Sequence, residues 1–413
     1  MDHALGLTTD LTRLPATAAE ATASPFARCE IHAELSSARA PWIEMEQLGA
    51  GSPYQSFAFA QAWQRTIGAA RGVRPMIVVA RDAAGRVNAV LPLGRSQRGA
   101  AWTAEFLGGA HANFRMGLFR PGLEVPRDAL LDLLRRAARL TEPRVDLFWL
   151  ANQPLAWEGH ANPMASLPRR PSPSFGYRTA LARNFDAWFA ARHARDTRRK
   201  FRRKRLRLDE PGEVSLVVAE DGEAARRILE AFLRQKQARL AAAGLDNPYA
   251  DPHTGRFLAA AATATPAQDA PLRLYALARG ERILATFGGV AGGGRFCGAF
   301  ISYDPDPAVA RCSPGQLLIF EAIRDLGARG FTTFDLGVGE AAYKDSNCET
   351  VEPLFDAAIA VTAAGAALGA LLMARRAVKR WIKHTPWARR IAERLRRAGA
   401  GLRGQSGGPT GVR

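Results

Sequence analysis

The sequence predicts an α/β protein, more narrowly α+β, made of two tandem units. Each unit is expected to be a mixed, mostly antiparallel sheet flanked by helices. The chain has 413 residues, which is enough for two to three domains of ~150 residues each. Apolar residues make up 47% and charged residues 23%, as in globular proteins with a packed core. One succession of hairpin, extended segment, helix and strand occurs twice, offset by about 190 residues, which indicates a duplicated unit.

The elements of the first unit follow from hydrophobic spacing and turn residues. They are a helix around Phe57–Trp63, strands over 75–81 and 86–93, a helix over 126–139 and a strand over 145–150. Phe57, Phe59 and Trp63 share one helix face. Asp82 to Gly85 is a turn between two β-rich runs, so these runs form a hairpin.

The second unit repeats this order. It contains strands over 272–279, 282–290 and 295–303, a helix over 313–324 and a strand over 331–336. Pro314 falls in the opening turn of the helix, where a missing N–H costs nothing. The predicted organisation is a flexible leader (1–30), an N-terminal domain (31–185), a C-terminal domain (186–360) that opens with a basic helix, and a basic amphipathic tail (361–413).

The formal net charge of +18 is concentrated in two segments. Residues 192–207 contain ten Lys or Arg and one acid, and residues 375–413 contain twelve and one. The rest of the chain is therefore close to neutral. The first segment is either a solvated helix between the domains or a site for an anionic ligand such as a phosphate-rich cofactor, RNA or lipid headgroups.

Several classes of protein are excluded by composition. The four cysteines are Cys29, Cys297, Cys312 and Cys348. They are scattered and form no C-x-x-C pair, which argues against a disulfide framework or a zinc knuckle. No metal is expected. The first residues have neither a basic nor an apolar signal region, and we find no run of ~20 strongly apolar residues. We therefore expect a cytoplasmic protein.

Candidate functional residues cluster between Tyr303 and Lys344. Ser313-Pro-Gly315 follows a strand and opens a helix, so it is either a phosphate seat at the helix dipole or a plain cap. Asp335 ends a buried strand and is either a cap of the next glycine turn or a catalytic carboxylate. Tyr343 and Lys344 follow a loop, where functional residues concentrate.

One further candidate pair lies in the first unit. His111 and Asn113 occupy a glycine-flanked loop and are candidates for an acceptor pocket. The alternative for His111 is a hydrogen-bonded structural histidine.

The ordered motifs Ser313-Pro-Gly, Phe334-Asp-x-Gly and Tyr343-Lys344 resemble the BioF2-like/CelD-type acetyltransferase domain. This family belongs to the GNAT superfamily and is related to FemAB-type aminoacyl transferases. The resemblance covers about residues 180–350, and the first half is similar to the second GNAT-like unit that such proteins carry. The chain departs from the usual GNAT phosphate loop, because Leu317 stands where a small residue is expected.

The resemblance implies acyl transfer from acyl-CoA, usually acetyl-CoA, to an amine acceptor, in envelope polysaccharide or lipid metabolism. Ser313, Gly315 and Gln316 would then hold the phosphate end of the donor. The catalytic residues would be Tyr303, Asp335, Tyr343 and Lys344. Two alternatives stay open, namely a FemAB-like transferase that uses charged tRNA, for which the basic helix argues, and a non-catalytic accessory protein of polysaccharide assembly.

The composition of the tail predicts a second property, which is attachment to a membrane surface. Apolar residues and cations alternate from Leu368 to Lys383, and Trp387 opens a second basic segment, a composition typical of an interfacial helix. We expect peripheral, salt-sensitive attachment to the inner face of the cytoplasmic membrane through this basic tail. The alternative is a helix packed on the C-terminal domain.

Overall fold

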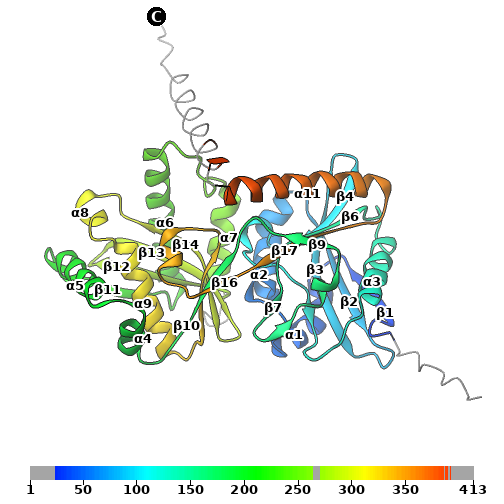
Figure 1. Ribbon diagram of the computed structural model, residues 1–413, viewed down its shortest axis with the longest axis horizontal. Helices are drawn as coiled ribbons and strands as arrows, with labels where there is room; N and C mark the ends of the chain where they lie inside the picture. Colours follow the sequence, from blue (N-terminus) through cyan, green and yellow to red (C-terminus); the bar gives the residue numbers. More distant parts are fainter. Residues whose placement is uncertain (1–23, 264–269, 386, 389–390, 392–413) are drawn as a thin grey trace, which may run out of the picture.

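The computed structural model describes residues 24–263, 270–385, 387–388 and 391. It contains two large sheets, each covered by helices on both faces (Figure 1). The leader predicted for residues 1–30 ends earlier than expected, because Phe26 is fully buried and the first strand begins at Arg28. Residues 1–23 lie outside the described part.

The first sheet has the strand order β1-β2-β3-β4-β6-β17-β9. These strands are β1 (Arg28–His32), β2 (Arg74–Arg81), β3 (Val87–Arg98), β4 (Ala101–Phe106), β6 (Leu147–Pro154), β17 (Leu354–Ala360) and β9 (Arg169–Pro171), and β5 (Leu118–Phe119) pairs with β3. Its helices are α1 (Arg39–Gln47), α2 (Phe57–Trp63), α3 (Arg127–Arg139) and α11 (Ala363–His384). Helix α3 covers one face through Leu130 and Leu134, while α1, α2 and α11 lie on the other.

The second sheet has the order β11-β12-β13-β14-β15-β10-β16. These are β11 (Ser215–Val218), β12 (Leu272–Arg279), β13 (Arg282–Gly292), β14 (Arg295–Tyr303), β15 (Thr333–Val338), β10 (Gly176–Ala180) and β16 (Thr350–Glu352). The helices are α4 (Phe185–Arg192), α5 (Arg195–Asp209), α6 (Gly222–Ala242), α7 (Pro252–Ala262), α8 (Pro307–Ala310), α9 (Pro314–Ala328) and α10 (Ala342–Asp345). A small hairpin, β7 (Ala156–Trp157) and β8 (His160–Ala161), stands apart.

The two sheets share one topology. Four antiparallel strands are followed by one parallel neighbour, β6 beside β4 in the first sheet and β15 beside β14 in the second. The helix that precedes this neighbour is α3 in the first unit and α9 in the second. This repetition confirms the fold class predicted from the duplicated element order.

The last strand of each unit joins the sheet of the other. β10 precedes residue 186 in the chain and pairs with β15 of the second sheet. β17 precedes residue 361 and pairs with β6 of the first sheet. The predicted boundary at 185/186 therefore does not separate the two sheets, because backbone hydrogen bonds between sequence-distant strands decide the membership of a sheet.

The two units also share a hydrophobic core. Aromatic side chains of α2 and α7 meet directly, with the ring centres of Phe59 and Phe257 5.3 Å apart. Tyr54, just before α2, is fully enclosed between Phe59 and Phe114. One cluster of buried apolar side chains thus spans both units.

Helix α11 lies along the first sheet, and its C-terminal end also contacts the second unit through Lys383 and Glu340 (Figure 1). Its Gly365 and Gly369 are buried, and its Leu368 and Leu372 pack on Leu147 and Trp149 of β6. The strand exchange explains this position, because β17 places the start of α11 on the first sheet. Among the described residues, none of the helices combines the length and the hydrophobicity of a membrane-spanning segment.

Candidate active site between β14 and β15

Strands β14 and β15 lie side by side for three residue pairs and then diverge. The parallel pairing runs from Arg295 beside Thr333 to Cys297 beside Asp335. Farther along β14, a shift in its ladder with β13 leaves Ala299 without a partner. Such a bulge bends the strand and removes one residue from the ladder, so that its backbone N–H can face a ligand. Beyond Cys297, β14 has no ladder partner on the side of β15, and we call this unpaired stretch the opening between β14 and β15.

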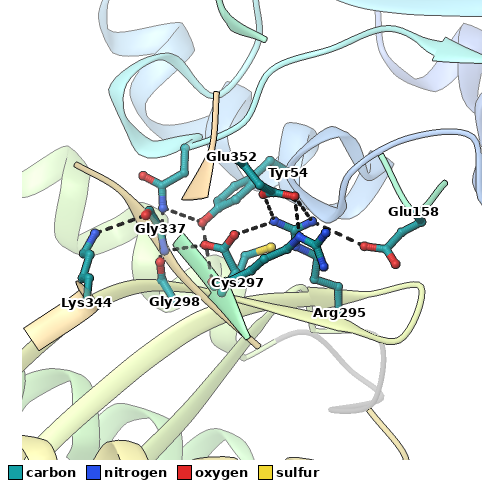
Figure 2. A network of polar contacts seen from close by, with 11 residues as sticks. Tyr54, Glu158, Arg295, Cys297, Gly298, Gly337, Lys344 and Glu352 are labelled. Atoms are coloured by element: carbon teal, nitrogen blue, oxygen red, sulfur yellow. Dashed lines mark hydrogen bonds and ion pairs between the residues drawn. The ribbon is translucent and has the colours of Figure 1, made fainter. Parts of the chain in front are cut away.

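Two side chains of the first unit contact β14 at this opening. Asn113 Nδ2 donates hydrogen bonds to the Gly298 carbonyl (3.1 Å) and to Tyr54 Oη (2.9 Å). Tyr54 Oη in turn lies 3.5 Å from the Cys297 carbonyl (Figure 2). These contacts satisfy β14 carbonyls at the point where β15 turns away. The first unit therefore fixes the shape of β14 beside the opening.

A buried arginine holds three carboxylates beneath the opening (Figure 2). Arg295 Nη2 lies 2.5 Å from Asp335 Oδ2 and 2.5 Å from Glu352 Oε2, and its Nη1 lies 3.4 Å from Glu158 Oε1. The guanidinium also lies 4.0 Å from the centre of the Trp157 ring. Because Trp157 and Glu158 belong to the first unit, Arg295 joins both units at the base of the site.

Asp335 and Lys344 both hold the backbone of Gly337, which lies near the end of β15. Asp335 Oδ1 accepts a hydrogen bond from the Gly337 N–H, and Lys344 Nζ donates to the Gly337 carbonyl at 3.2 Å. Asp335 is fully buried, and this burial raises the pKa of its carboxyl to about 6, although the attraction of Arg295 opposes the shift. Its hydrogen bond to the Gly337 N–H is the contact expected if Asp335 caps the glycine turn, one of the two roles predicted from the sequence.

The two tyrosines that were predicted to be catalytic, Tyr303 and Tyr343, lie in different elements. Tyr303 ends β14, and the Arg239 guanidinium lies 3.8 Å from the centre of its ring. Tyr343 lies on α10 and is 36% exposed, and burial of the rest of the side chain raises the pKa of its phenol. Within the described residues, neither phenol oxygen has a hydrogen-bond partner. Both are therefore free to contact a ligand.

The start of α9 lies beside the basic helix α5. Ser313 precedes α9 in a left-handed conformation (φ 53°), and Lys204 Nζ of α5 lies 2.6 Å from its Oγ. Burial and the neighbouring Lys200 lower the pKa of the Lys204 ammonium. Gln316 Nε2 donates to Asn347 Oδ1 at 3.1 Å. An ammonium and the positive end of a helix dipole at one place favour a bound anion.

A cavity of about 390 Å³ lies between the two units. Its lining is mainly apolar and includes Phe59, Tyr249, Phe257, Val290 and Phe300. His111 and Asn113 line it from the first unit, and Ala299 lines it from β14. A cavity of this size and character suits part of a small molecule. Through Ala299 and Asn113, the cavity adjoins the opening between β14 and β15.

His111 is a neutral side chain with a fixed tautomer. Its Nδ1 lies 3.4 Å from Trp63 Nε1, and because an indole N–H can only donate, Nδ1 accepts and Nε2 carries the proton. Burial, reinforced by the charge of Arg71, lowers the pKa of His111 to about 4. At neutral pH, His111 is therefore equipped to donate a hydrogen bond through Nε2.

A second groove, of about 430 Å³, lies between α4, α5 and α9. Its lining combines four phenylalanines with four arginines: Phe185, Phe189, Phe201, Phe320, Arg198, Arg202, Arg205 and Arg324. Arg324 lies 4.5 Å from the centre of the Phe185 ring, and Arg205 pairs with Glu321 at 3.3 Å. The basic helix is thus docked on α9, with an aromatic and cationic surface beside it.

Sequence reasoning missed the residues that connect the two units. It did not single out Arg295, Glu352 or Tyr54, and it did not select Lys204 from the basic run. A signal existed for Arg295, which is the one charged residue in the strand that ends at Tyr303. The other partners are distant in sequence and carried no local pattern.

Comparison with known proteins places this geometry in a family. A model of the acetyltransferase (GNAT) domain matches residues 195–345, from α5 to α10. The resemblance predicted from Ser313-Pro-Gly, Phe334-Asp-x-Gly and Tyr343-Lys344 is confirmed at the level of a GNAT acetyltransferase domain over residues 195–345, which supports an acyltransferase. Assignment to the CelD-type subgroup stays a prediction.

Solved structures extend the likeness over both units. FemX aligns with a TM-score of 0.54 at 10% identity, covering 80% of this chain and 96% of FemX. A conserved protein of unknown function from Bacteroides thetaiotaomicron aligns with a TM-score of 0.52 at 12% identity, covering 80% and 99%. A tandem GNAT protein from the clavulanic acid pathway aligns at 0.44 and 13%, covering 81% and 100%. At these identities the likeness shows the fold alone. No curated protein matches the sequence significantly.

Proposed function

We propose that this GNAT protein is an N-acyltransferase that moves an acyl group from acyl-CoA to an amine acceptor. The observation that carries the proposal is the position of Ala299. This residue of β14 has no partner in the ladder with β13, lies beyond the stretch of β14 that pairs with β15, and also lines the cavity between the units. A donor entering along β14 and an acceptor entering through the cavity would therefore meet at one residue.

The phosphate end of the donor is assigned to the start of α9. Ser313, Gly315 and Gln316 would contact it, with Lys204 supplying a charge that the unusual phosphate loop lacks. A Cβ at Gly315 would lie 3.4 Å from Ile301 and 3.6 Å from Tyr303, so this residue adjoins the end of β14 that carries Tyr303. Bound acyl-CoA supplies a thioester, and backbone N–H groups at the Ala299 bulge would stabilise the negative charge on its carbonyl oxygen during attack.

The reaction also requires proton transfers. The charged acceptor ammonium first loses a proton to solvent or to a base, and the neutral nitrogen then bonds the acyl carbon. The C–S bond breaks, and the nitrogen loses a second proton to give the neutral amide. The departing thiolate then takes a proton. Tyr303 and Tyr343 have free phenols and are the proposed donors of that proton. Asp335 and Lys344 would act by holding the Gly337 turn.

Titration calorimetry with CoA thioesters, with and without tRNA, tests the donor. We expect heat of binding with acetyl-CoA or a longer acyl-CoA that is weakened in Lys204→Met. Transfer is then measured by thiol release with a panel of amines. Absence of binding to every thioester at millimolar concentration would refute the proposal.

Aminoacyl-tRNA is a second candidate donor, favoured by the groove between α4, α5 and α9. Aromatic rings stack on unpaired bases and arginines neutralise phosphates, as at single-stranded nucleic-acid sites. Binding of charged tRNA that is lost in the paired variant Phe189→Ala, Arg202→Ala, together with no response to thioesters, would support this alternative over acyl-CoA.

The biological acceptor is proposed to belong to envelope polysaccharide or lipid metabolism, following the CelD-type resemblance. Untargeted lipid and metabolite profiling of a deletion strain tests this context. A non-catalytic accessory role is the remaining alternative. It predicts that a folded Tyr343→Phe or Asp335→Asn protein still complements the deletion, whereas an enzyme with these residues at its site predicts reduced complementation.

A further inference from the structure

Helix α11 turns most of its basic side chains toward the protein and an apolar face outward, which is the reverse of an ordinary surface helix. Five of its side chains are basic: Arg375, Arg376, Lys379, Arg380 and Lys383. Three of these point to the body. Arg376 pairs with Asp356 at 2.6 Å, Arg380 donates to the Ser172 carbonyl at 2.6 Å, and Lys383 pairs with Glu340 at 2.7 Å. These three cations therefore hold the helix on the protein and are unavailable to an external surface.

The outward face of α11 is apolar along its whole length. Its exposed members follow helical spacing and are Ala364, Ala367, Ala370, Leu371, Ala374, Val378 and Trp381. Leu371, Val378 and Trp381 are 47%, 55% and 51% exposed. Ordinary surface helices present polar residues to water, so a helix that turns this face outward needs a partner.

Two further features continue this face. Beyond α11, Trp387 is 57% exposed and its ring packs edge to face against that of Trp381, with 5.1 Å between centres. Arg375 and Lys379, both exposed, flank the apolar face on one side. Tryptophans at a boundary between apolar and basic residues are typical of helices that lie in the headgroup region of a bilayer.

We propose that the outward face of α11 docks on an anionic lipid bilayer, lying in its interface. Charge decides between this partner and a second copy of the chain. Residues 375–413 contain twelve Lys or Arg and one Glu. An anionic surface complements this segment, whereas pairing two α11 faces would bring two such segments together. Figure 1 shows α11 on the outside of the first unit, with no element of the described chain over it.

This mechanism differs from the purely electrostatic one predicted from the sequence. The contacts now come from burial of Leu371, Val378 and Trp381, with Arg375 and Lys379 adding preference for anionic headgroups. Attachment should therefore weaken in high salt without being abolished. It does not depend on the acyltransferase proposal, because no residue of this face lies at the β14 opening.

Vesicle flotation of the full chain tests the proposal. Wild type is expected to float with vesicles containing 30% phosphatidylglycerol, and the triple variant Leu371→Ser, Val378→Ser, Trp381→Ser is expected to bind at least about tenfold less. Leu140→Ser is the matched control, since Leu140 is 58% exposed at the end of α3, on the opposite face of the sheet. It should bind as wild type does. Circular dichroism confirms that each variant is folded.

Two other results would overturn the proposal. One is equal flotation of the triple variant and wild type, or no flotation of either. The other is a dimer of wild type in light scattering that the triple variant abolishes without any vesicle binding, which would assign the face to a second copy. The paired variant Arg375→Gln, Lys379→Gln should lose preference for anionic vesicles while keeping residual binding to neutral ones.

Discussion

Arg295 and Asp335 form an ion pair at 2.5 Å in which the arginine side chain is 2% exposed and the aspartate is fully buried. Arg295 lies at the start of the stretch in which β14 and β15 are paired, and Asp335 lies at its end. Glu352 and Glu158 share the same guanidinium, and Glu352 also pairs with Arg178 at 2.7 Å. Arg295 is thus the buried cation that links the three carboxylates at the base of the candidate site.

Arg295→Met is expected to destabilise the protein strongly. Removing one partner of a buried ion pair typically costs about 3–5 kcal/mol, because the remaining charges lose their compensation. The free energy of unfolding from urea titration measures this. Arg282→Met is the control, since Arg282 is 48% exposed and pairs with Asp304 and Asp306 at the surface, where loss of a pair costs about 1 kcal/mol or less. Equal losses of unfolding free energy in the two variants would contradict the proposed contribution of Arg295 to stability.

Asp335→Asn should change how stability depends on pH. The pKa of Asp335 is raised to about 6 in the folded protein by burial and lies near 3.9 in an unfolded chain. Its contribution to stability is therefore full below about pH 4 and is lost as the pH rises through 6. The difference in Tm between Asp335→Asn and wild type should therefore move in favour of the variant as the pH rises from 4.5 to 7.5. A Tm difference that is constant, or that moves the other way, would show that Asp335 titrates normally.

Lys204→Met is expected to raise the KM for acyl-CoA about tenfold, because one charge-assisted contact to a phosphate is worth about 1.5–3 kcal/mol, while kcat changes little. Arg207→Met provides the comparison on the same helix, since Arg207 is exposed and removes the same charge from the chain. Steady-state kinetics at fixed acceptor concentration separates the two parameters. An equal rise in both variants would mean that Lys204 acts only through the general charge of α5.

His111→Gln should retain more activity than His111→Ala. The glutamine amide can replace the Nε2 donor, whereas alanine removes it, and a KM for the acceptor raised about five- to tenfold is expected for alanine. Because the pKa of His111 is about 4, wild type should show no inflection near pH 6.5 arising from this residue. If both variants are equally inactive and such an inflection is present, His111 acts as a base.

Gly365→Ala should loosen α11 from the first sheet. A Cβ at this position would fall 1.9 Å from the Asp146 carbonyl oxygen, a backbone atom that cannot move aside. Overpacking of this kind costs about 1–3 kcal/mol or more. At Gly369, the nearest atom would be Leu147 Cδ1 at 3.2 Å, which can adjust, so Gly369→Ala should be milder. Limited proteolysis near α11 and urea unfolding measure the difference.

The duplication and the element types could be predicted from the sequence because they depend on local patterns. The hairpin around Asp82–Gly85 and the helix after Ser313 were expected from turn residues and helical spacing, and both are present as β2–β3 and α9. The GNAT resemblance rested on motifs that are likewise contiguous in the chain. The first strand was missed, since β1 is short and follows a segment without periodicity.

What the sequence alone determined about this protein is its repeated α/β unit, its acyltransferase motifs and the location of its two basic segments. The tertiary structure decided the rest. It placed β10 and β17 in exchanged sheets, gathered Arg295, Asp335 and Glu158 around one charge, and turned the apolar face of α11 outward. Local spacing specifies the conformation of a segment, whereas partners hundreds of residues apart are selected by strand pairing and burial, which act only when the whole chain is folded.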